Sequence, residues 1–384
     1  MTFSFGGCGR TARWCASFLG VALLSACSLW PGGPERPKPA DLGANVPVLG
    51  VRQAWAARIG STAGLALQAN VQGSAVTVAS SDGTVASFNA RTGKELWRTK
   101  VAEGVAAGVG SDGRWTALVS RDNDLVVLEA GREAWRHRLP AQVFTAPLVA
   151  GERVFVLAAD RSISAFDAAR GTTLWSLPGT GAPLVLRQAG VLLAVGDTLV
   201  AGVSGRLVGL NPDAGSVRWD APLAVARGTN DVERLVELVG PVSRVKDSLC
   251  ARAFQASVAC ADLAAGRVDW VQKSNGGSGI SGDAATVVGS ESNGKLVAWD
   301  RQSGKQLWVS ERLRYRNLSA PLLLGRSVIV GDGSGTLHFL SQDDASPLNR
   351  VATDGSAIEA APVVADDTLV VVTRAGGIFG FRPD

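Results

Sequence analysis

The 384-residue sequence is poor in the side chains that most often carry catalysis or bind metals. It has two histidines and one tyrosine, and its five cysteines include no Cys-x-x-Cys pair and no adjacent pair. His137 and His338 show no metal-ligand spacing, which excludes most His-based acid/base, triad and zinc chemistry. The chain also lacks a Walker loop and a Gly-x-Ser-x-Gly elbow. Nothing in it predicts an enzyme.

Charge is also scarce. Only 19% of residues are charged and the net charge is +4, which falls to about +2 if Arg10 and Arg13 leave with a signal peptide, so no nucleic-acid partner is indicated. Hydrophobic residues make up 46%, enough for a large core, and the chain has 46 glycines. This composition predicts short strands joined by tight turns rather than long helices.

Three short motifs look functional but fit turns better. Gly108-x-Gly110-x-x-Gly113 and Gly277-x-Gly279-x-x-Gly282 match the dinucleotide fingerprint, yet neither is expected to open a helix, so we interpret both as turn glycines. Asp122-Asn123-Asp124 lacks the rest of a calcium loop and predicts a hairpin turn. We therefore expect no cofactor and no metal.

The N-terminus has the features of an export signal. Arg10 and Arg13 precede an apolar run from Trp14 to Leu24, and no acidic residue occurs before Glu35. The run is shorter than the roughly 20 apolar residues that span a membrane. We interpret residues 1–26 as a signal peptide.

Leu24-Ser25-Ala26-Cys27 resembles the bacterial lipobox. The resemblance implies a lipidated Cys27, a flexible Pro/Gly-rich tether over residues 27–49, and attachment to a membrane, with Ser28 rather than Asp favouring the periplasmic face of the outer membrane. The alternative is an ordinary cleavage site followed by Cys.

The decisive feature is a repeat with a period near 42 residues. Its clearest copies are Gly83–Trp97 and Gly294–Trp308, and successive Trp positions are 38, 40, 44, 51 and 38 residues apart. The Gly-x-x-x-Trp pairs are Gly93/Trp97, Gly131/Trp135, Gly171/Trp175, Gly215/Trp219, Gly266/Trp270 and Gly304/Trp308, with a degenerate copy at Ala345/Asn349. This length and pattern predict one four-stranded blade of a β-propeller per unit.

The two ends of the sequence complement each other. The last copy, Gly377–Phe381, stops before its Trp strand, while Val51–Arg58 is a Trp strand without a preceding hairpin. We therefore predict an all-β, eight-bladed propeller of four-stranded antiparallel blades over residues 50–384, closed by the N-terminal strand.

The repeated tryptophans are expected to be structural and to pack between adjacent blades. They are Trp55, Trp97, Trp135, Trp175, Trp219, Trp270 and Trp308.

Cys250 and Cys260 are the two thiols left after signal removal and lipidation. Aligning Asp262 with Asp167 places them opposite each other in one hairpin, which predicts a disulfide. The alternative is two small buried residues, and neither case makes a redox site.

The pattern Leu-x-Ala-x-Asp-x-x-x-Gly-x-x-x-Trp resembles the repeat of quinoprotein dehydrogenases, eight-bladed enzymes that hold pyrroloquinoline quinone and calcium. That family stacks the quinone on adjacent cysteines, which this chain lacks. The inter-repeat segments of this chain are also too short for insertions that would cover a cofactor. A quinoprotein dehydrogenase is thus the enzymatic alternative.

Lipobox, length, eight blades and Trp repeat together resemble the BamB family of outer-membrane assembly lipoproteins over essentially the whole mature chain. The resemblance implies a non-enzymatic scaffold of the BAM complex that binds the POTRA domains of BamA, contacts other BAM subunits, and assists insertion of nascent outer-membrane proteins. A generic periplasmic propeller that binds another protein or a glycan is the second alternative.

The family's contact residues lie in a Leu-x-Leu-Arg segment and a following acidic segment. The first matches Leu184, Leu186 and Arg187, and the second matches Arg234 and Glu237, whereas Val239 stands where the family pattern has an acid. These five residues are the predicted BamA contacts. The alternative for Leu184 and Leu186 is that both are strand residues facing the core.

Overall fold

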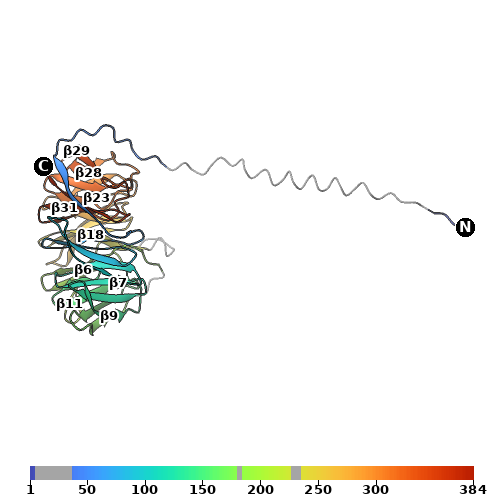
Figure 1. Cartoon of the computed structure of the whole chain (residues 1–384), viewed down its shortest axis with the longest axis vertical. Coiled ribbons are helices and arrows are strands. Elements are labelled where there is room, and N and C mark those ends of the chain that lie inside the picture. The colour runs from blue at the N-terminus through green and yellow to red at the C-terminus, as the bar shows by residue number, and fades with distance from the viewer. Residues whose placement is uncertain (5–36, 180–183, 226–234) are drawn as a thin grey trace. The chain divides into compact units, whose positions relative to one another are not determined.

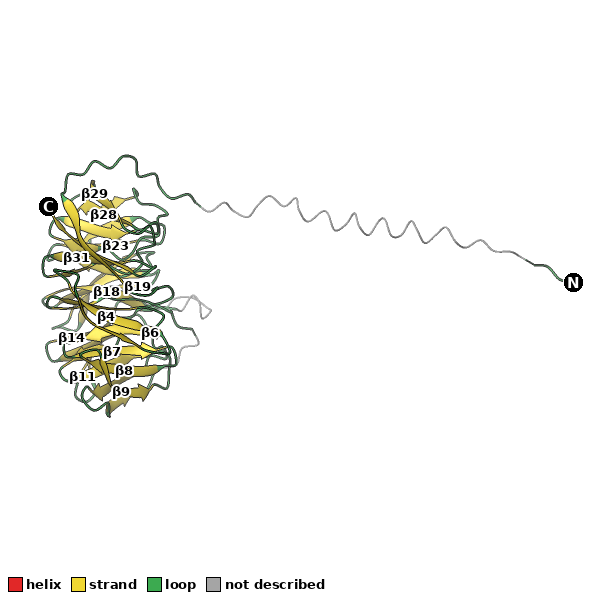
Figure 2. Ribbon diagram, viewed as in Figure 1, coloured by secondary structure: helices red, strands yellow, loops and turns green. Residues whose placement is uncertain are grey.

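The computed structural model describes residues 1–4, 37–179, 184–225 and 235–384. The chain divides into two units, Met1–Lys38 and Pro39–Asp384, and the fold is that of the second. All regular structure in the described residues is β-strand (Figure 2). None of these residues belongs to a helix long and apolar enough to cross a membrane.

Eight sheets of four antiparallel strands form a ring, which confirms the predicted propeller. Figure 1 shows the propeller from its side. Seven of the blades are each built from four consecutive strands, and the first strands of several neighbouring blades contact each other toward the axis. Blades 1 to 4 are β2 (Asn70–Gln72), β3 (Ala75–Ala79), β4 (Thr84–Asn89) and β5 (Glu95–Lys100); β6 (Val105–Ser111), β7 (Trp115–Ser120), β8 (Asp124–Glu129) and β9 (Arg132–Arg138); β10 (Leu148–Ala150), β11 (Arg153–Leu157), β12 (Ile163–Asp167) and β13 (Thr173–Leu177); β14 (Leu192–Val195), β15 (Thr198–Val203), β16 (Arg206–Leu210) and β17 (Val217–Pro222).

Blades 5 to 8 continue the pattern, and the last blade takes its outer strand from the N-terminal side. They are β18 (Leu238–Val245), β19 (Ser248–Ala253), β20 (Ser257–Asp262) and β21 (Arg267–Lys273); β22 (Ile280–Gly282), β23 (Thr286–Ser290), β24 (Leu296–Asp300) and β25 (Gln306–Ser310); β26 (Leu322–Leu324), β27 (Ser327–Gly331), β28 (Thr336–Ser341) and β29 (Pro347–Ala352); β30 (Val363–Ala365), β31 (Thr368–Val372), β32 (Gly377–Pro383) and β1 (Val51–Arg58).

The ring closes as predicted. β1 pairs antiparallel with β32, from Val51 opposite Pro383 to Arg58 opposite Gly377. Because every blade alternates apolar side chains on both faces, the second and third strands are almost wholly buried between blades.

Each repeated Trp rests on the next blade. Trp55 donates its indole N–H to the Ala90 carbonyl oxygen at 2.7 Å, and a Cβ added to Gly93 would lie 2.7 Å from the indole ring. Gly93 has φ 70°, so it supplies both the left-handed turn and the space for the ring. Four other tryptophans make the same bond, to the carbonyl three residues before the residue equivalent to Gly93 in the next blade. They are Trp135, Trp175, Trp270 and Trp308.

The residue paired with each Trp on the third strand of its own blade is compact, because the indole ring covers it. These partners are Gly380, Ser87, Val127, Ala165, Gly209, Cys260 and Ala298, in the order of the seven tryptophans. Blade 7 inverts the pair: Phe339 stands at the compact position and Asn349 at the Trp position. The large and small side chains have exchanged strands.

Candidate functional site

One face of the ring carries the candidate site. In each antiparallel blade, the turn between the second and third strands lies at the same end as the segment that leads to the next blade, so these connections share one face, here called the loop face. Backbone hydrogen bonds join the two kinds of connection, as from Ser81 N–H to the Ser61 carbonyl at 2.8 Å and from Ala159 N–H to the Gln142 carbonyl at 2.7 Å. The inter-blade segments between β13 and β14 and between β17 and β18 contain the predicted contact residues that the structure describes, namely Leu184, Leu186, Arg187 and Glu237.

The Leu-x-Leu-Arg segment is an exposed loop. Leu184 is 40% exposed and Val185 38%, and neither lies in a strand, so the core-strand alternative for Leu184 is wrong. Leu186 is half-buried and lines a cavity of about 50 Å³ together with Phe144, Leu157 and Leu238. Leu186 therefore holds the loop against the propeller, while Leu184 and Val185 remain partly exposed to solvent.

Arg187 follows on the same loop and is exposed. Its guanidinium carbon lies 5.8 Å from the centroid of the Phe144 ring, close enough for a cation–π contact. Among the described residues it makes no hydrogen bond or ion pair, so its N–H donors are available to a carboxylate of another molecule. It also borders a channel of about 520 Å³ between the inter-blade segments, next to Gln68 and Pro241.

Glu237 forms an ion pair within the propeller, and its contact with BamA stays a prediction. Arg161, in the turn between β11 and β12, donates from Nη2 to Glu237 Oε1 at 2.7 Å and from Nε at 3.1 Å. The two side chains are only 15% and 17% exposed. This ion pair joins blade 3 to the entry of blade 5 beneath the Leu184–Arg187 loop, so Glu237 supports the loop and Arg161 occupies its carboxylate. Val239, at the departure from the family pattern, is buried in β18.

Sequence reasoning missed Phe144, Thr145 and Arg161. Thr145 Oγ1 accepts a hydrogen bond from Gly190 N–H at 2.9 Å and so holds the C-terminal end of the loop. These residues come from an earlier blade, and no signal in the Leu-x-Leu-Arg segment itself points to them. Two predicted residues, Arg234 and Cys27, lie outside the described residues.

The remaining sequence motifs occupy structural positions. Gly108 and Gly110 lie in β6 and Gly113 in the following turn, with no helix after them. Asn123, with φ 69°, forms the tip of the β7–β8 turn. The ring centroid of His137 lies 4.8 Å from that of Phe166, with the two planes tilted by 56°, and His338 is buried beside Asp332. In the part of the chain that the structure describes, no group of three or more His, Cys, Asp and Glu residues could hold a metal ion.

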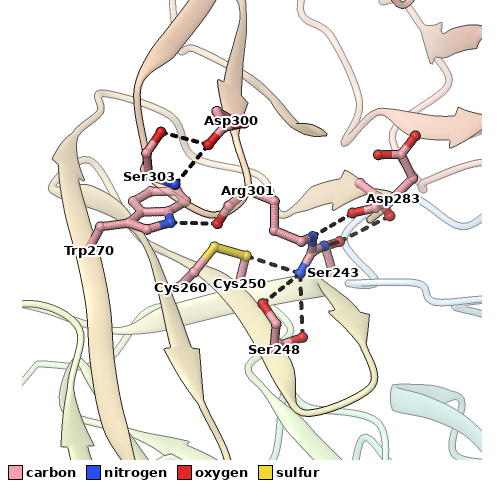
Figure 3. The surroundings of a disulfide bond; sticks show 10 residues. Ser243, Ser248, Cys250, Cys260, Trp270, Asp283, Asp300, Arg301 and Ser303 are labelled. Atoms are coloured by element: carbon pink, nitrogen blue, oxygen red, sulfur yellow. Dashed lines mark hydrogen bonds between the residues drawn. A yellow bond between two sulfur atoms is a disulfide. The ribbon is translucent and has the colours of Figure 1, made fainter. Parts of the chain in front are cut away.

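Cys250 and Cys260 lie directly opposite each other in β19 and β20, as the repeat alignment predicted, and the structure joins them by a disulfide. The disulfide sits under Trp270, whose paired residue is Cys260 (Figure 3). Arg301 of blade 6 reaches across to Ser243, to Ser248 and, at 3.3 Å, to the Cys250 sulfur. Burial lowers the pKa of Arg301, and the Asp283 carboxylate opposes that shift. The cluster fastens blade 5 to blade 6 and is closed to solvent at both cysteines.

These features define a Trp-docked, eight-bladed propeller with an apolar and basic loop on one face. A family model described as outer membrane protein assembly factor BamB matches residues 81–310. A BamB from Burkholderia pseudomallei is 38% identical over 97% of this chain and 98% of its own length. The chain belongs to the BamB family of outer membrane protein assembly factors.

Solved structures agree with this fold. BamB from Moraxella catarrhalis superimposes with a TM-score of 0.79 at 24% identity, covering 86% of this chain and 99% of that one. A quinohemoprotein alcohol dehydrogenase from Comamonas testosteroni has a TM-score of 0.68 at 16% identity, covering 87% of this chain and 76% of that enzyme. At such identities both likenesses concern the fold alone.

Proposed function

We propose that this chain is a non-enzymatic scaffold lipoprotein of the outer-membrane β-barrel assembly machinery, and that its loop face binds the POTRA domains of BamA. Its relatives are named outer membrane protein assembly factors, which supports a place in that complex. The observation that carries the proposal is the Leu184–Arg187 loop, which presents exposed apolar side chains beside an arginine with no hydrogen-bonding partner in the described residues.

The physical rationale is that of an interface hot spot. Leu184 and Val185 supply apolar area that is removed from water on binding, and Arg187 supplies a directional charge that fixes the register of the partner. Support from Leu186, Thr145 and the Arg161–Glu237 pair limits the ordering cost of the loop when a partner binds.

In this proposal the scaffold is held at the periplasmic face of the outer membrane by lipid on Cys27, and it assists assembly and insertion of β-barrel proteins. An acylated cysteine with two or more chains gives stable anchoring, whereas a single chain gives only reversible binding. Nascent outer-membrane proteins and the other BAM subunits are the remaining partners that the proposal includes.

The test is affinity purification of the tagged, lipidated full-length protein from mildly solubilised membranes, with mass spectrometry of what co-purifies. We expect BamA with wild type and at least a tenfold loss with Leu184→Ala/Arg187→Ala, at unchanged melting temperature. The matched control is Leu307→Ala/Arg267→Ala, which removes an exposed leucine and an exposed arginine from outer strands. Equal recovery of BamA by all three proteins would contradict the assigned surface, and recovery by none would favour a generic propeller.

The quinoprotein alternative makes a separate prediction. It requires bound quinone, which absorbs in the visible and near-ultraviolet range, and oxidation of an alcohol. Cys250 and Cys260 are paired across a hairpin instead of adjacent in sequence, so the described residues offer no platform of the kind that family uses. We expect the purified protein to show neither quinone absorbance nor alcohol oxidation after incubation with pyrroloquinoline quinone and Ca²⁺.

A further inference from the structure

Residues 40–49 lie along blade 7 and are here called the strap. We expected these residues to belong to the tether, yet the structure hydrogen-bonds them to the propeller at both ends. At one end, Ala40 N–H donates to the Arg314 carbonyl at 2.9 Å, and Arg316 Nη1 donates to the Ala40 carbonyl at 2.8 Å. At the other, Val48 N–H donates to the Leu348 carbonyl at 2.8 Å.

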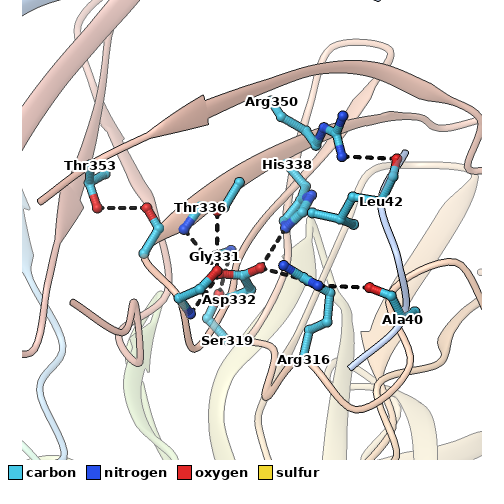
Figure 4. A network of polar contacts seen from close by, with 12 residues as sticks. Ala40, Leu42, Arg316, Ser319, Gly331, Asp332, Thr336, His338, Arg350 and Thr353 are labelled. Atoms are coloured by element: carbon cyan, nitrogen blue, oxygen red, sulfur yellow. Dashed lines mark hydrogen bonds and ion pairs between the residues drawn. The ribbon is translucent and has the colours of Figure 1, made fainter. Parts of the chain in front are cut away.

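Side chains of β29 hold the middle of the strap. Arg350 donates to the Leu42 carbonyl at 3.0 Å (Figure 4). It also donates to the Gly43 carbonyl at 2.8 Å. Asn45 donates to Asn349 Oδ1 at 3.1 Å, and Leu42 packs against the apolar cluster of blades 6 and 7. The strap therefore covers the outer edge of β29, whose backbone groups would otherwise be open to pairing with another strand.

The strap has a definite direction. Arg314 and Arg316 belong to the segment between β25 and β26, which is on the loop face, whereas Leu348 lies at the start of β29, near the opposite face. The strap thus runs antiparallel to β29 from the loop face to the opposite face, where β1 begins (Figure 1). Ala40, the N-terminal end of the strap, therefore lies at the loop face.

The arginine that holds Ala40 is itself fixed in place. Arg316 Nε donates to Asp332 Oδ2 at 2.9 Å, and His338 Nε2 lies 3.0 Å from the same oxygen. Burial would raise the pKa of Asp332, but hydrogen bonds from His338, Ser334, Thr336 and Arg316 hold it well below its usual range. Since a charged carboxylate only accepts, His338 donates its Nε2 proton. The N-terminal end of the strap, at Ala40, is therefore held by a buried network that contains an ionised carboxylate.

We propose that the strap turns the loop face toward the lipid surface. The proposal rests on lipidation of Cys27. The 13 residues from Cys27 to Ala40 reach at most about 43–47 Å even when fully extended. A blade strand of five or six residues is about 17–20 Å long, so in the proposed orientation the opposite face lies farther from the lipid surface than the loop face by roughly that distance. In the same orientation the loop that carries Leu184 and Arg187 is on the face nearer to the membrane.

The test uses two single-cysteine labels on blade 3 of the lipidated full chain, bound to vesicles that carry an energy acceptor in the headgroup region. Gln142→Cys is on the loop face and Ala169→Cys is in the β12–β13 turn on the opposite face, and both positions are exposed. The native Cys250 and Cys260 are buried in their disulfide and are not labelled. We expect at least twofold stronger energy transfer from position 142 than from position 169.

Releasing the strap should abolish the difference. Arg316→Ala/Arg350→Ala removes the side chains that hold Ala40, Leu42 and Gly43, while the control Arg326→Ala removes an exposed arginine of blade 7 that does not touch the strap. Faster amide exchange at Val48 and Leu49, with an intact propeller by circular dichroism, verifies release. Equal transfer from both labels in wild type, or stronger transfer from position 169, overturns the proposal.

Failure of the anchor is seen separately. A protein without lipid on Cys27 does not float with vesicles, which contradicts the lipoprotein assignment. In that case an N-terminal hexahistidine in place of residues 1–27, which also removes the unlipidated Cys27 thiol, attaches the chain to nickel-chelating vesicles. The same two labels then test the strap, with the same expected and opposing outcomes.

Discussion

Seven interfaces of the ring and the one between blades 7 and 8 achieve the same packing in two ways. At the seven, an indole ring covers a compact residue of its own blade and rests on the turn of the next, where in six cases a left-handed glycine makes room. Between blades 7 and 8 there is no turn to rest on, because the outer strand of blade 8 comes from the other end of the chain. There Phe339 supplies the bulk, and Asn349 donates to the Leu49 carbonyl at 2.7 Å in place of the indole N–H.

The comparison teaches that the Trp repeat has two separable functions, filling volume and capping a carbonyl. A tryptophan performs both functions only where the neighbouring blade has a turn between its third and fourth strands. Blade 8 has no such turn, and there Phe339 of β28 fills the volume and Asn349 of β29 caps the carbonyl. The strap then covers the blade edge that the missing indole leaves.

The largest expected effect is loss of a buried docking tryptophan. Trp270→Ala removes a ring that is 8% exposed, together with its bond to Arg301, and should lower the free energy of unfolding by about 3–5 kcal/mol. Asn349→Ala at the seam should cost only about 1–2 kcal/mol, the value of its lost hydrogen bonds. Urea denaturation measures both; equal costs would remove the distinction between the two kinds of interface.

Removing the disulfide should have the next largest effect. The bond closes a loop of sequence separation 10 beneath Trp270, so Cys250→Ala/Cys260→Ala should cost about 2–3 kcal/mol by chain entropy. A reducing agent added to unfolded wild type should give the same loss on refolding. A change below about 0.5 kcal/mol in both experiments would contradict a stabilising role for the disulfide.

Exchanging glycine and alanine should change the free energy of unfolding differently at the two kinds of turn, the one with glycine below the indole ring and the one with alanine there. Gly304→Ala places a Cβ 2.5 Å from the Trp270 ring at a residue with φ 69°, and should cost about 1–3 kcal/mol. Ala345, which occupies the same place below Trp308, already has φ 57°. Ala345→Gly should therefore be neutral or stabilising by up to about 1 kcal/mol. The melting temperatures of the two variants measure both effects. Destabilisation by Ala345→Gly would contradict the inference that Ala345 occupies the same strained turn position as the glycines.

The smallest effect concerns acid. Because the pKa of Asp332 is lower in the folded protein than in the unfolded chain, its contribution to stability is full above the unfolded value of about 3.9 and declines as the pH falls below it. The free energy of unfolding, measured by urea denaturation, should therefore decline below about pH 4. Asp332→Asn should reduce this decline, and an unchanged acid profile in that variant would contradict the contribution assigned to Asp332.

Much of the fold could be predicted from sequence because the residues that pack between blades, above all the tryptophans, recur at regular positions. The spacing of Trp97 to Trp308 marks the blades, and the unpaired strand around Trp55 predicts the closure with β32. The same alignment carries an unused signal, since Phe339 stands where the other copies have small residues such as Ala165 and Ala298.

The site was only partly predictable. A family pattern located Leu184 and Arg187, and the structure shows their exposed loop. The contacts that support this loop, from Phe144, Thr145 and Arg161, come from segments distant in sequence that only ring closure brings together. The strap was missed for a related reason: its bonds use mainly backbone carbonyls, which leave no mark on residue identity.

Closure by β1 also affects how the molecule is made. Val51 is synthesised more than three hundred residues before its partner Pro383, so the first strand of the propeller to emerge stays without its neighbour until the last residues are available. Pairing at such a sequence separation carries a large loop-closure entropy and slows folding. Blade 8 is therefore completed only once the whole chain is present, and a chain interrupted before β32 leaves an open ring with an unpaired strand edge for quality-control proteases and chaperones to recognise.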